Sequence, residues 1–392
     1  MFGIPFPYIG KPCGNPLRQT DPFRLLAFPT EQTLEAVIPA ALKKFLSARK
    51  YAEFMKPLEM PSCDDRLLWD TYMSIYHLPT LVAADDLGLF SLLKREPATV
   101  DEVAKGLSLG PRATEALLGV MSSLGFLVQQ ANRFSLTEVS RNFLLPESPY
   151  YWGGLLHIFR DPPITGASVR DALKKDKQVL NLAADFWETP EVDLEKAKAF
   201  TQAMHSHSFP AAMGVALRGD FSGVDRLLDV AGGSGCFCIA LALRYPKMRL
   251  TMAELPVVCP LAQAYIVEYG LQNRVQTIAL DMFKERWPSG HDAVFFSNIF
   301  HDWGRGRCEH LAALSFEVLP SGGYIYLHEM LLADTKDGPR TATLFSMHMM
   351  CFTQGKQFTL DELESLLRSQ GFVDITSTPT YGYYSVVKGR KP

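Results

Sequence analysis

The second half of the chain alternates short apolar runs with longer stretches of helical spacing. Beyond residue 220 the apolar runs are "RLLDVAG", "RLTMAEL", "VQTIALDM", "AVFFSNIF" and "GGYIYLHEM". Runs that are apolar throughout are typical of strands buried on both faces, and their alternation with helices predicts a parallel sheet covered by helices on both sides. We therefore predict a doubly wound α/β domain.

The end of the chain predicts one more helix and two strands. In "FTLDELESLLRSQGF", Thr359 and Glu362 have the spacing of a capping box, and Gly371 has the position of a helix C-cap. The runs "VDITSTPT" and "YGYYSVVKG" follow. Because almost no residues separate them, these last two strands are expected to pair antiparallel.

Residues 67–150 are mainly helical in pattern and contain a compact unit. Thr99 and Glu102 predict a capping box at the start of a short helix, Pro111 opens a second helix, and Gly125 closes it. The run "FLVQQANRFSLT" then alternates like a β-hairpin. This order of elements is typical of a winged helix.

Winged helices often bind DNA, so a metabolite-sensing regulator is one alternative for this unit. Its second helix, "RATEALLGVMSSLG", carries one arginine among small and apolar residues. Such a surface offers little for phosphates or base edges. We interpret the unit as a packing or dimerisation domain.

The first 66 residues begin rich in proline and aromatic residues and continue with helical spacing in "TEQTLEAVIPAALKKFLSARKYAEF". They are expected to form a partly helical extension that packs on another surface, and a poorly ordered tail is the alternative. The predicted domains are the extension, 1–66, a helical winged-helix domain, 67–190, and the α/β domain, 191–392.

Composition narrows the partners and the compartment. The chain has 392 residues, 47% hydrophobic residues and a net charge of -3, which favours a globular protein with no general attraction to nucleic acid or anionic lipid. Its seven cysteines are scattered, and the start lacks the pattern of a signal peptide. We expect a cytoplasmic protein that binds neither a membrane nor nucleic acid.

A nucleotide site is predicted where the first strand runs into a glycine-rich turn, "DVAGGSGCF". Glu254 ends the next strand, where its carboxylate can accept hydrogen bonds from a ribose diol, and Asp281 follows the third strand. A dinucleotide fingerprint would need a glycine where Cys238 stands, so S-adenosylmethionine fits better. The alternative is a glycine turn that serves only chain reversal.

The motifs "LLDVAGGSG", "AELPVV", "DMF", "HDW", "LPSGGYIYLHEMLL" and "LLRSQGF" occur in an order that resembles the caffeate-type and acetylserotonin-type small-molecule O-methyltransferases, including bacterial natural-product members. The resemblance covers residues 67–392. It implies a class I methyltransferase (Rossmann-like) domain whose last strand is antiparallel, and a mainly helical winged-helix N-terminal domain that forms a homodimer.

The resemblance also implies which residues bind S-adenosylmethionine and its product S-adenosylhomocysteine. These residues are Gly232, Gly233, Gly235, Glu254, Leu255, Asp281, Met282, Phe283 and Ser297.

By the same resemblance, His301 is the general base that removes the proton of the acceptor hydroxyl, and Glu329 orients it. A phenol with a pKa near 10 is a poor nucleophile until it is deprotonated, and an imidazole can accept that proton. The rest of catalysis is the alignment of the acceptor oxygen with the methyl carbon and the sulfur of the cofactor. Because alignment needs no metal, we expect none. The alternative for His301 is an ordinary core histidine, and the alternative for Glu329 is a solvated acid at a strand end.

One position departs from the family. The second carboxylate of the family belongs in "CFTQGKQFT", and the matching residue is Gln357. An amide can hold a histidine by a hydrogen bond but contributes no charge. C-methylation, or a rearrangement, decarboxylation or hydroxylation on the same fold, therefore remains the alternative to O-methylation.

The acceptor is expected to be a small aromatic or polyketide-like metabolite with a hydroxyl group. The residues that the resemblance places around it are Met204, His205, Asp302, Met347, His348 and Phe352. Two alternatives remain open, because Asp302 could instead begin the next helix and "LFSMHMMCF" is also a plausible buried helix.

Overall fold

The computed structural model describes residues 60–158, 164–180 and 194–392, so most of the predicted N-terminal extension lies outside the described residues. The chain divides into two compact units, residues 1–69 and 70–392. Helix α4 (Arg66–Met73) begins in the first unit and ends in the second. Within the described residues, no helix is both long and apolar enough to cross a bilayer.

The predicted winged helix is confirmed within the second unit. Thr99 and Glu102 form the expected capping box, and Ala131 and Asn132 have φ angles of 48° and 61°, which is the backbone of a tight hairpin turn. The elements in chain order are η1 (Ser74–Tyr76), α5 (His77–Asp86), α6 (Leu89–Leu93), α7 (Val100–Leu107), α8 (Pro111–Ser123), β1 (Leu127–Gln130), β2 (Arg133–Leu136) and α9 (Glu138–Phe143).

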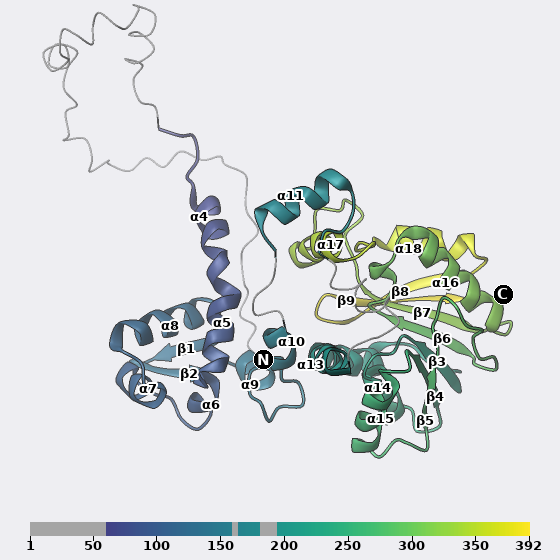
Figure 1. The fold of residues 1–392 in the computed structure, drawn as a ribbon, viewed down its shortest axis with the longest axis horizontal. Helices are drawn as coiled ribbons and strands as arrows, with labels where there is room; N and C mark the ends of the chain where they lie inside the picture. Colours follow the sequence, from purple (N-terminus) through teal and green to yellow (C-terminus); the bar gives the residue numbers. More distant parts are fainter. Residues whose placement is uncertain (1–59, 159–163, 181–193) are drawn as a thin grey trace, which may run out of the picture. The chain divides into compact units, whose positions relative to one another are not determined.

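The rest of the second unit contains the predicted doubly wound domain (Figure 1). Two helices, α10 (Gly153–Ile158) and α11 (Gly166–Lys175), lie within the predicted domain 67–190. The helices of the doubly wound domain are α13 (Leu194–Arg218), α14 (Cys236–Arg244), α15 (Cys259–Glu268), η2 (Phe300–Asp302), α16 (Arg305–Val318), α17 (Arg340–Phe352) and α18 (Leu360–Ser369). Its strands are β3 (Arg226–Val230), β4 (Arg249–Glu254), β5 (Val275–Ala279), β6 (Ala293–Ser297), β7 (Tyr324–Met330), β8 (Val373–Tyr381) and β9 (Tyr384–Arg390).

The strands form one seven-stranded sheet in the order β5-β4-β3-β6-β7-β9-β8. The pairs from β5 to β7 are parallel, and β9 is antiparallel to both β7 and β8. This confirms the antiparallel last strand. The sheet order reverses between β3 and β6, which is where doubly wound folds bind ligands outside the carboxyl ends of their strands.

Two apolar cores fix the sheet between helices. One core packs α13, α14 and α15 against one face, and the other packs α16 and α18 against the opposite face. Figure 1 shows these helices on the two sides of the sheet. The fully buried strand residues on both faces explain the uninterrupted apolar runs of the sequence.

Candidate active site

The glycine-rich turn between β3 and α14 needs its glycines for two reasons. Gly233 and Gly235 have φ angles of 57° and 74°, a left-handed backbone that favours glycine. At Gly232 a Cβ atom would lie 2.6 Å from Met252 Cγ and 2.8 Å from Asp229 Oδ2. Gly232 therefore packs tightly against β4 and β3, whereas a Cβ atom on Gly233 would meet nothing within 4 Å, so the backbone at Gly233 borders open space at the carboxyl end of β3.

Glu254 ends β4 beside this turn and is 8% exposed. Its Oε2 accepts a hydrogen bond from Gly233 N at 2.9 Å, and its Oε1 accepts one from Leu255 N at 2.7 Å. Burial raises the pKa of the carboxyl group, and the two backbone hydrogen bonds oppose that rise. Each carboxylate oxygen still has a second lone pair for a ligand hydroxyl.

The segment after β5 lies at the same edge. Asp281 Oδ1 accepts a hydrogen bond from Phe283 N at 3.0 Å, and Asp281 Oδ2 lies 2.8 Å from Lys284 Nζ. Burial opposes the charge of Asp281, but the hydrogen bonds and charge of Lys284 and the hydrogen bond from Phe283 N together outweigh burial and lower the pKa of Asp281. Met282 O is held by Trp287 Nε1 at 3.0 Å, which fixes the turn.

His301 and Glu329 form a buried pair, as the motif order predicts. His301 lies in η2 after β6 and is 4% exposed, and Glu329 lies on β7 and is 1% exposed. His301 Nδ1 is 2.8 Å from Glu329 Oε2, and Glu329 Oε1 accepts a hydrogen bond from Phe300 N at 3.0 Å. Burial disfavours the charged ring, but the charge and hydrogen bond of Glu329, together with the charge of Asp302, outweigh burial and raise the pKa of His301 to about 9.

Gln357 completes this group. It is fully buried, and its Nε2 lies 3.2 Å from His301 Nδ1. The segment reaches His301 because residue 355 is a glycine: a Cβ atom on Gly355 would lie 2.6 Å from the His301 carbonyl carbon and 2.7 Å from Trp303 N. The sequence reasoning missed Gly355, although a glycine two residues before Gln357 was visible.

Asp302 is not the start of the next helix. It belongs to η2, and α16 begins at Arg305 with Gly304 as its N-cap. Asp302 Oδ1 lies 3.8 Å from His301 Nε2, so a carboxylate faces the ring nitrogen that Glu329 leaves open. This is consistent with the predicted position of Asp302 beside the acceptor.

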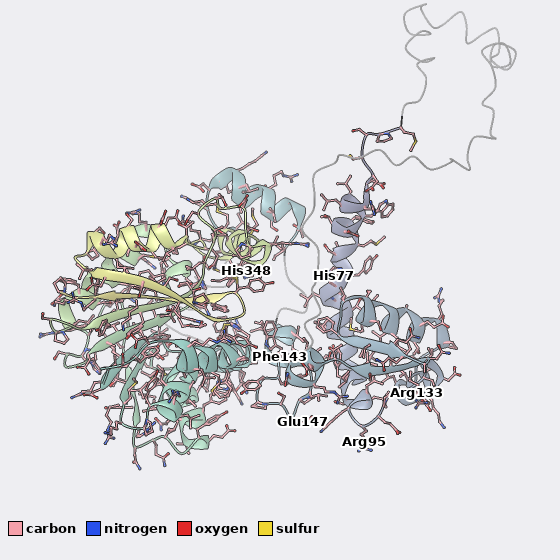
Figure 2. The ribbon with its side chains drawn as sticks, turned by 180° about the vertical axis from the view of Figure 1, so that it is seen from behind. His77, Arg95, Arg133, Phe143, Glu147 and His348 are labelled. Carbon is pink, nitrogen blue, oxygen red and sulfur yellow. The ribbon has the colours of Figure 1, made fainter. Side chains whose placement is uncertain are left out.

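Helix α17 contributes aromatic rings on the His301 side. Phe345 meets the His301 ring edge-on at 5.2 Å, and His348 packs against Phe345 and Phe352 at 5.9 and 4.3 Å. Figure 2 labels His348 on this helix. Burial, together with the nearby charge of His301, lowers the pKa of His348 to about 4, so this ring is neutral. Met347, one residue earlier, is 36% exposed.

The structure puts His205 of α13 against the glycine turn. Its ring stacks on Tyr265 at 4.0 Å with an interplanar angle of 7°, and its Nδ1 lies 2.9 Å from Ser234 Oγ. Met204, the neighbouring residue, is half-buried. The histidine therefore supports the turn that the sequence assigns to the cofactor, and its predicted role at the acceptor stays a prediction.

Two polar residues at the same edge were not singled out from the sequence. Asp229 of β3 is 1% exposed and accepts a hydrogen bond from Cys238 Sγ at 3.3 Å, and burial raises its pKa to about 7. His328 of β7 lies with its Nδ1 2.8 Å from Ser297 Oγ. Both stand inside quoted motifs, "LLDVAGG" and "YLHEM", flanked by apolar residues of a strand.

These residues fit S-adenosylmethionine, the cofactor that the resemblance implies. The backbone at Gly233 borders open space with no atom within 4 Å of a Cβ position, and Glu254, which is hydrogen-bonded to Gly233 N, offers lone pairs suited to a ribose diol beside it. Among the described side chains, Asn298 Oδ1 and His328 Nε2 are buried without a hydrogen-bond partner at the end of β6 and on β7. Nowhere in the described ranges, this site included, are three His, Cys, Asp or Glu side chains grouped as a metal ion would require.

Comparisons with known proteins bear on this site. Residues 168–373 match the family model of the O-methyltransferase domain, and residues 69–146 match that of the O-methyltransferase dimerisation domain. A 3-hydroxy-5-methyl-1-naphthoate 3-O-methyltransferase of Streptomyces sahachiroi is 34% identical, over 83% of this chain and 95% of the relative. The acetylserotonin O-methyltransferase of Macaca mulatta is 28% identical, over 79% of this chain and 93% of the relative.

Solved structures agree with these sequence matches. The crystal structure of human N-acetylserotonin methyltransferase in complex with SAM superposes with a TM-score of 0.71 at 26% identity, covering 85% of this chain and 99% of that chain. The apo form of the S-adenosylmethionine-dependent methyltransferase SibL has a TM-score of 0.69 at 26% identity, with 84% of this chain and 100% of that chain covered.

Proposed function

Because the chain belongs to the O-methyltransferase family, with S-adenosylmethionine as its methyl donor, we propose that it methylates a hydroxyl of a small aromatic or polyketide-like metabolite with His301 as general base. The observation that carries this proposal is the buried contact of 2.8 Å between His301 Nδ1 and Glu329 Oε2. A carboxylate in that place holds the ring proton on Nδ1, so Nε2 is the nitrogen that accepts the acceptor proton.

The basicity of His301 suits a phenolic hydroxyl. A His301 pKa of about 9 lies close to the pKa of about 10 of a phenol, so transfer of the proton from oxygen to Nε2 is nearly balanced. Bound S-adenosylmethionine supplies an electrophilic methyl group. The residues of this chain then orient the acceptor oxygen and take up its proton.

The proposed acceptor class rests on the rings of α17 and on one relative. Phe345 and His348 are half-buried and offer aromatic, uncharged surfaces near His301, which suit a flat aromatic ligand, whereas Phe352 is 3% exposed and packs in the core behind His348. The Streptomyces sahachiroi relative is named for a hydroxylated naphthoate. A hydroxylated aromatic acid or polyketide is therefore the first class to test.

We further propose a cytoplasmic homodimer. The match to the dimerisation domain supports self-association, as do the exposed apolar residues Ile75 and Tyr76, which are 57% and 56% exposed. The cysteines in the described part of the chain are free thiols, which suits a reducing compartment. The net charge of -3 gives no reason to expect nucleic acid or a membrane as a partner.

The experiment that tests this function follows label from methyl-labelled S-adenosylmethionine into a panel of hydroxylated naphthoates, phenols and polyketides. We expect label on an acceptor oxygen, a loss of about a hundredfold or more in His301→Ala, and no loss in the exposed control His310→Ala. Label on carbon would replace O-methylation by C-methylation. Equal transfer by wild type and His301→Ala would contradict the base assignment.

A further inference from the structure

A histidine and a serine are paired at the carboxyl edge beside His301. Ser297 is the last residue of β6, and in the parallel register it lies opposite His328 of β7. His328 Nδ1 is 2.8 Å from Ser297 Oγ. Because β6 also pairs in parallel with β3, this serine and the glycine turn that follows β3 lie at the carboxyl ends of neighbouring strands.

The His328 ring is rigidly held and uncharged. The residue is fully buried, and its ring stacks on Tyr384 at 4.7 Å with an interplanar angle of 16° and contacts Phe237 at 5.1 Å. Burial lowers the pKa of His328 to about 3, and the positive charges of His207 and His301 act in the same direction. A neutral imidazole carries a proton on one nitrogen and a lone pair on the other.

The surroundings decide which nitrogen carries the proton. His328 Nε2 is buried and has no hydrogen-bond partner among the described residues. A buried N–H without an acceptor is more costly than an unused lone pair, so the proton belongs on Nδ1, where it is donated to Ser297 Oγ. The Ser297 hydroxyl oxygen then accepts the hydrogen bond from His328 Nδ1. The proton of the Ser297 hydroxyl can therefore be donated to a ligand.

Asn298 adds an acceptor next to this donor. Its φ angle is 55°, a left-handed conformation that asparagine tolerates, and its backbone N donates to His328 O at 3.1 Å. Its side chain is hydrogen-bonded to Tyr384, whereas Asn298 Oδ1 is buried without a partner. Two consecutive residues at the end of β6 therefore supply one directed hydroxyl donor and one amide oxygen acceptor.

A donor beside an acceptor is complementary to an α-amino acid end, which carries a carboxylate and an ammonium group. We propose that His328 is a positioning residue that aims the Ser297 hydroxyl at the carboxylate of S-adenosylmethionine, while Asn298 Oδ1 accepts from its ammonium group. This inference rests on the cofactor site of the proposed function. It assigns a role in holding the amino acid end to two residues, His328 and Asn298, outside the predicted site.

The test compares two ligands that differ in this end. S-Adenosylhomocysteine carries the amino acid group, and 5′-methylthioadenosine has the same nucleoside and a thioether but lacks it. By calorimetry, Ser297→Ala is expected to weaken binding of S-adenosylhomocysteine about tenfold or more and to leave 5′-methylthioadenosine within about twofold. The control is Ser315→Ala, because Ser315 is equally small, fully buried and bonded only to Leu311 O at 2.8 Å on α16.

Two substitutions of His328 separate positioning from packing. In His328→Asn the amide nitrogen occupies the place of Nδ1 and retains the donor to Ser297, so binding of S-adenosylhomocysteine should stay within about threefold. His328→Leu removes the donor and should reproduce the Ser297→Ala loss. If His328→Leu does not fold, the comparison of Ser297→Ala with His328→Asn still decides the matter.

Three results would overturn the inference: equal losses for both ligands, no loss for either ligand in Ser297→Ala, or a His328→Asn variant as weak as Ser297→Ala. Failure of the proposed function gives a different result. In that case wild type binds S-adenosylhomocysteine but puts no label on an acceptor oxygen, whereas failure of this inference alone leaves methyl transfer intact and removes only the ligand-dependent loss in Ser297→Ala.

Discussion

Replacing Glu329 by glutamine removes the charge that sets the basicity of His301 and keeps the side chain almost the same size. The two charges are 2.8 Å apart, which corresponds to an attraction of about 6 kcal/mol at an effective dielectric constant of about 20. Since about 1.4 kcal/mol equals one pH unit, this attraction is large enough to move the His301 pKa by up to about 4 pH units. We expect Glu329→Gln to lower the pKa of His301 well below about 9, because burial then opposes the charged ring and only the weaker attraction of Asp302 still favours it.

The substitution also changes the tautomer of the ring. Phe300 N now donates to Glu329 Oε1, and the introduced amide would keep its oxygen there. Its NH₂ group would then face His301 Nδ1 and donate to it, which forces the ring proton onto Nε2. The nitrogen that must accept the acceptor proton is then occupied, so a loss of about 10²- to 10⁴-fold in the maximal rate is expected.

The assay is kcat/KM for methyl transfer between about pH 5.5 and 10.5. The wild-type value should rise with pH and level off near the His301 pKa of about 9, because the base acts when it is unprotonated. In Glu329→Gln the rise should move to the acid side by about two pH units or more, to a much lower plateau. The control for loss of a surface carboxylate is Glu309→Gln. This reasoning would be refuted if the pH profile of Glu329→Gln were unshifted and its rates stayed within about threefold of wild type.

Three further predictions use the same group of residues. Gly355→Ala should destabilise the fold by about 1–3 kcal/mol and reduce the rate of methyl transfer. The control is Gly306→Ala, whose added Cβ meets nothing within 4 Å and which should change neither stability nor rate. Equal urea midpoints for the two variants would contradict the steric argument. Because the pKa of His301 is raised in the folded state, its ion pair with Glu329 stabilises the folded state fully below about pH 6.5, and this stabilisation is lost as the pH rises through about 9. The melting temperature should therefore fall over that pH range more steeply in wild type than in Glu329→Gln. Parallel curves of melting temperature against pH for the two proteins would exclude this contribution. Gln357→Glu places a second carboxylate where an amide nitrogen now lies 3.2 Å from His301 Nδ1, so the pH profile of transfer should move to the alkaline side, and an unchanged profile would show that Gln357 has no electrostatic role.

Local patterns predicted the architecture well because they act over a few residues. The capping boxes at Thr99 and Thr359, the hairpin turn at Asn132 and the near-absent connection before Tyr384 each fix a boundary without reference to the rest of the chain. The uninterrupted apolar runs fixed the burial of the strands. Together they determine a doubly wound sheet with an antiparallel end.

The meeting of His301, Glu329 and Gln357 was predicted through the order of family motifs. Periodicity places each residue near an element end, but it carries no information on which ends meet. The contact also requires Gly355, whose importance is visible only once the His301 carbonyl lies against it. No pattern within a single element signals such a contact between distant segments.

His328 was missed for a related reason. In "GGYIYLHEM" it continues a buried apolar strand, and its hydrogen bond to Ser297 arises from the pairing of β6 with β7. His205 likewise stacks on Tyr265 of another helix. Both roles depend on tertiary neighbours that the sequence does not specify.

The central claim is that His301 removes the acceptor proton, and a series of phenolic acceptors with decreasing pKa tests it most directly. The measurement is the ratio of kcat/KM between wild type and His301→Ala for each acceptor at one pH. The ratio should be about a hundredfold or more for phenols with a pKa near 10 and should approach one for phenols that are already ionised. A ratio that stays the same across the series, or stays near one for the least acidic phenols, would contradict the role of His301 as the base.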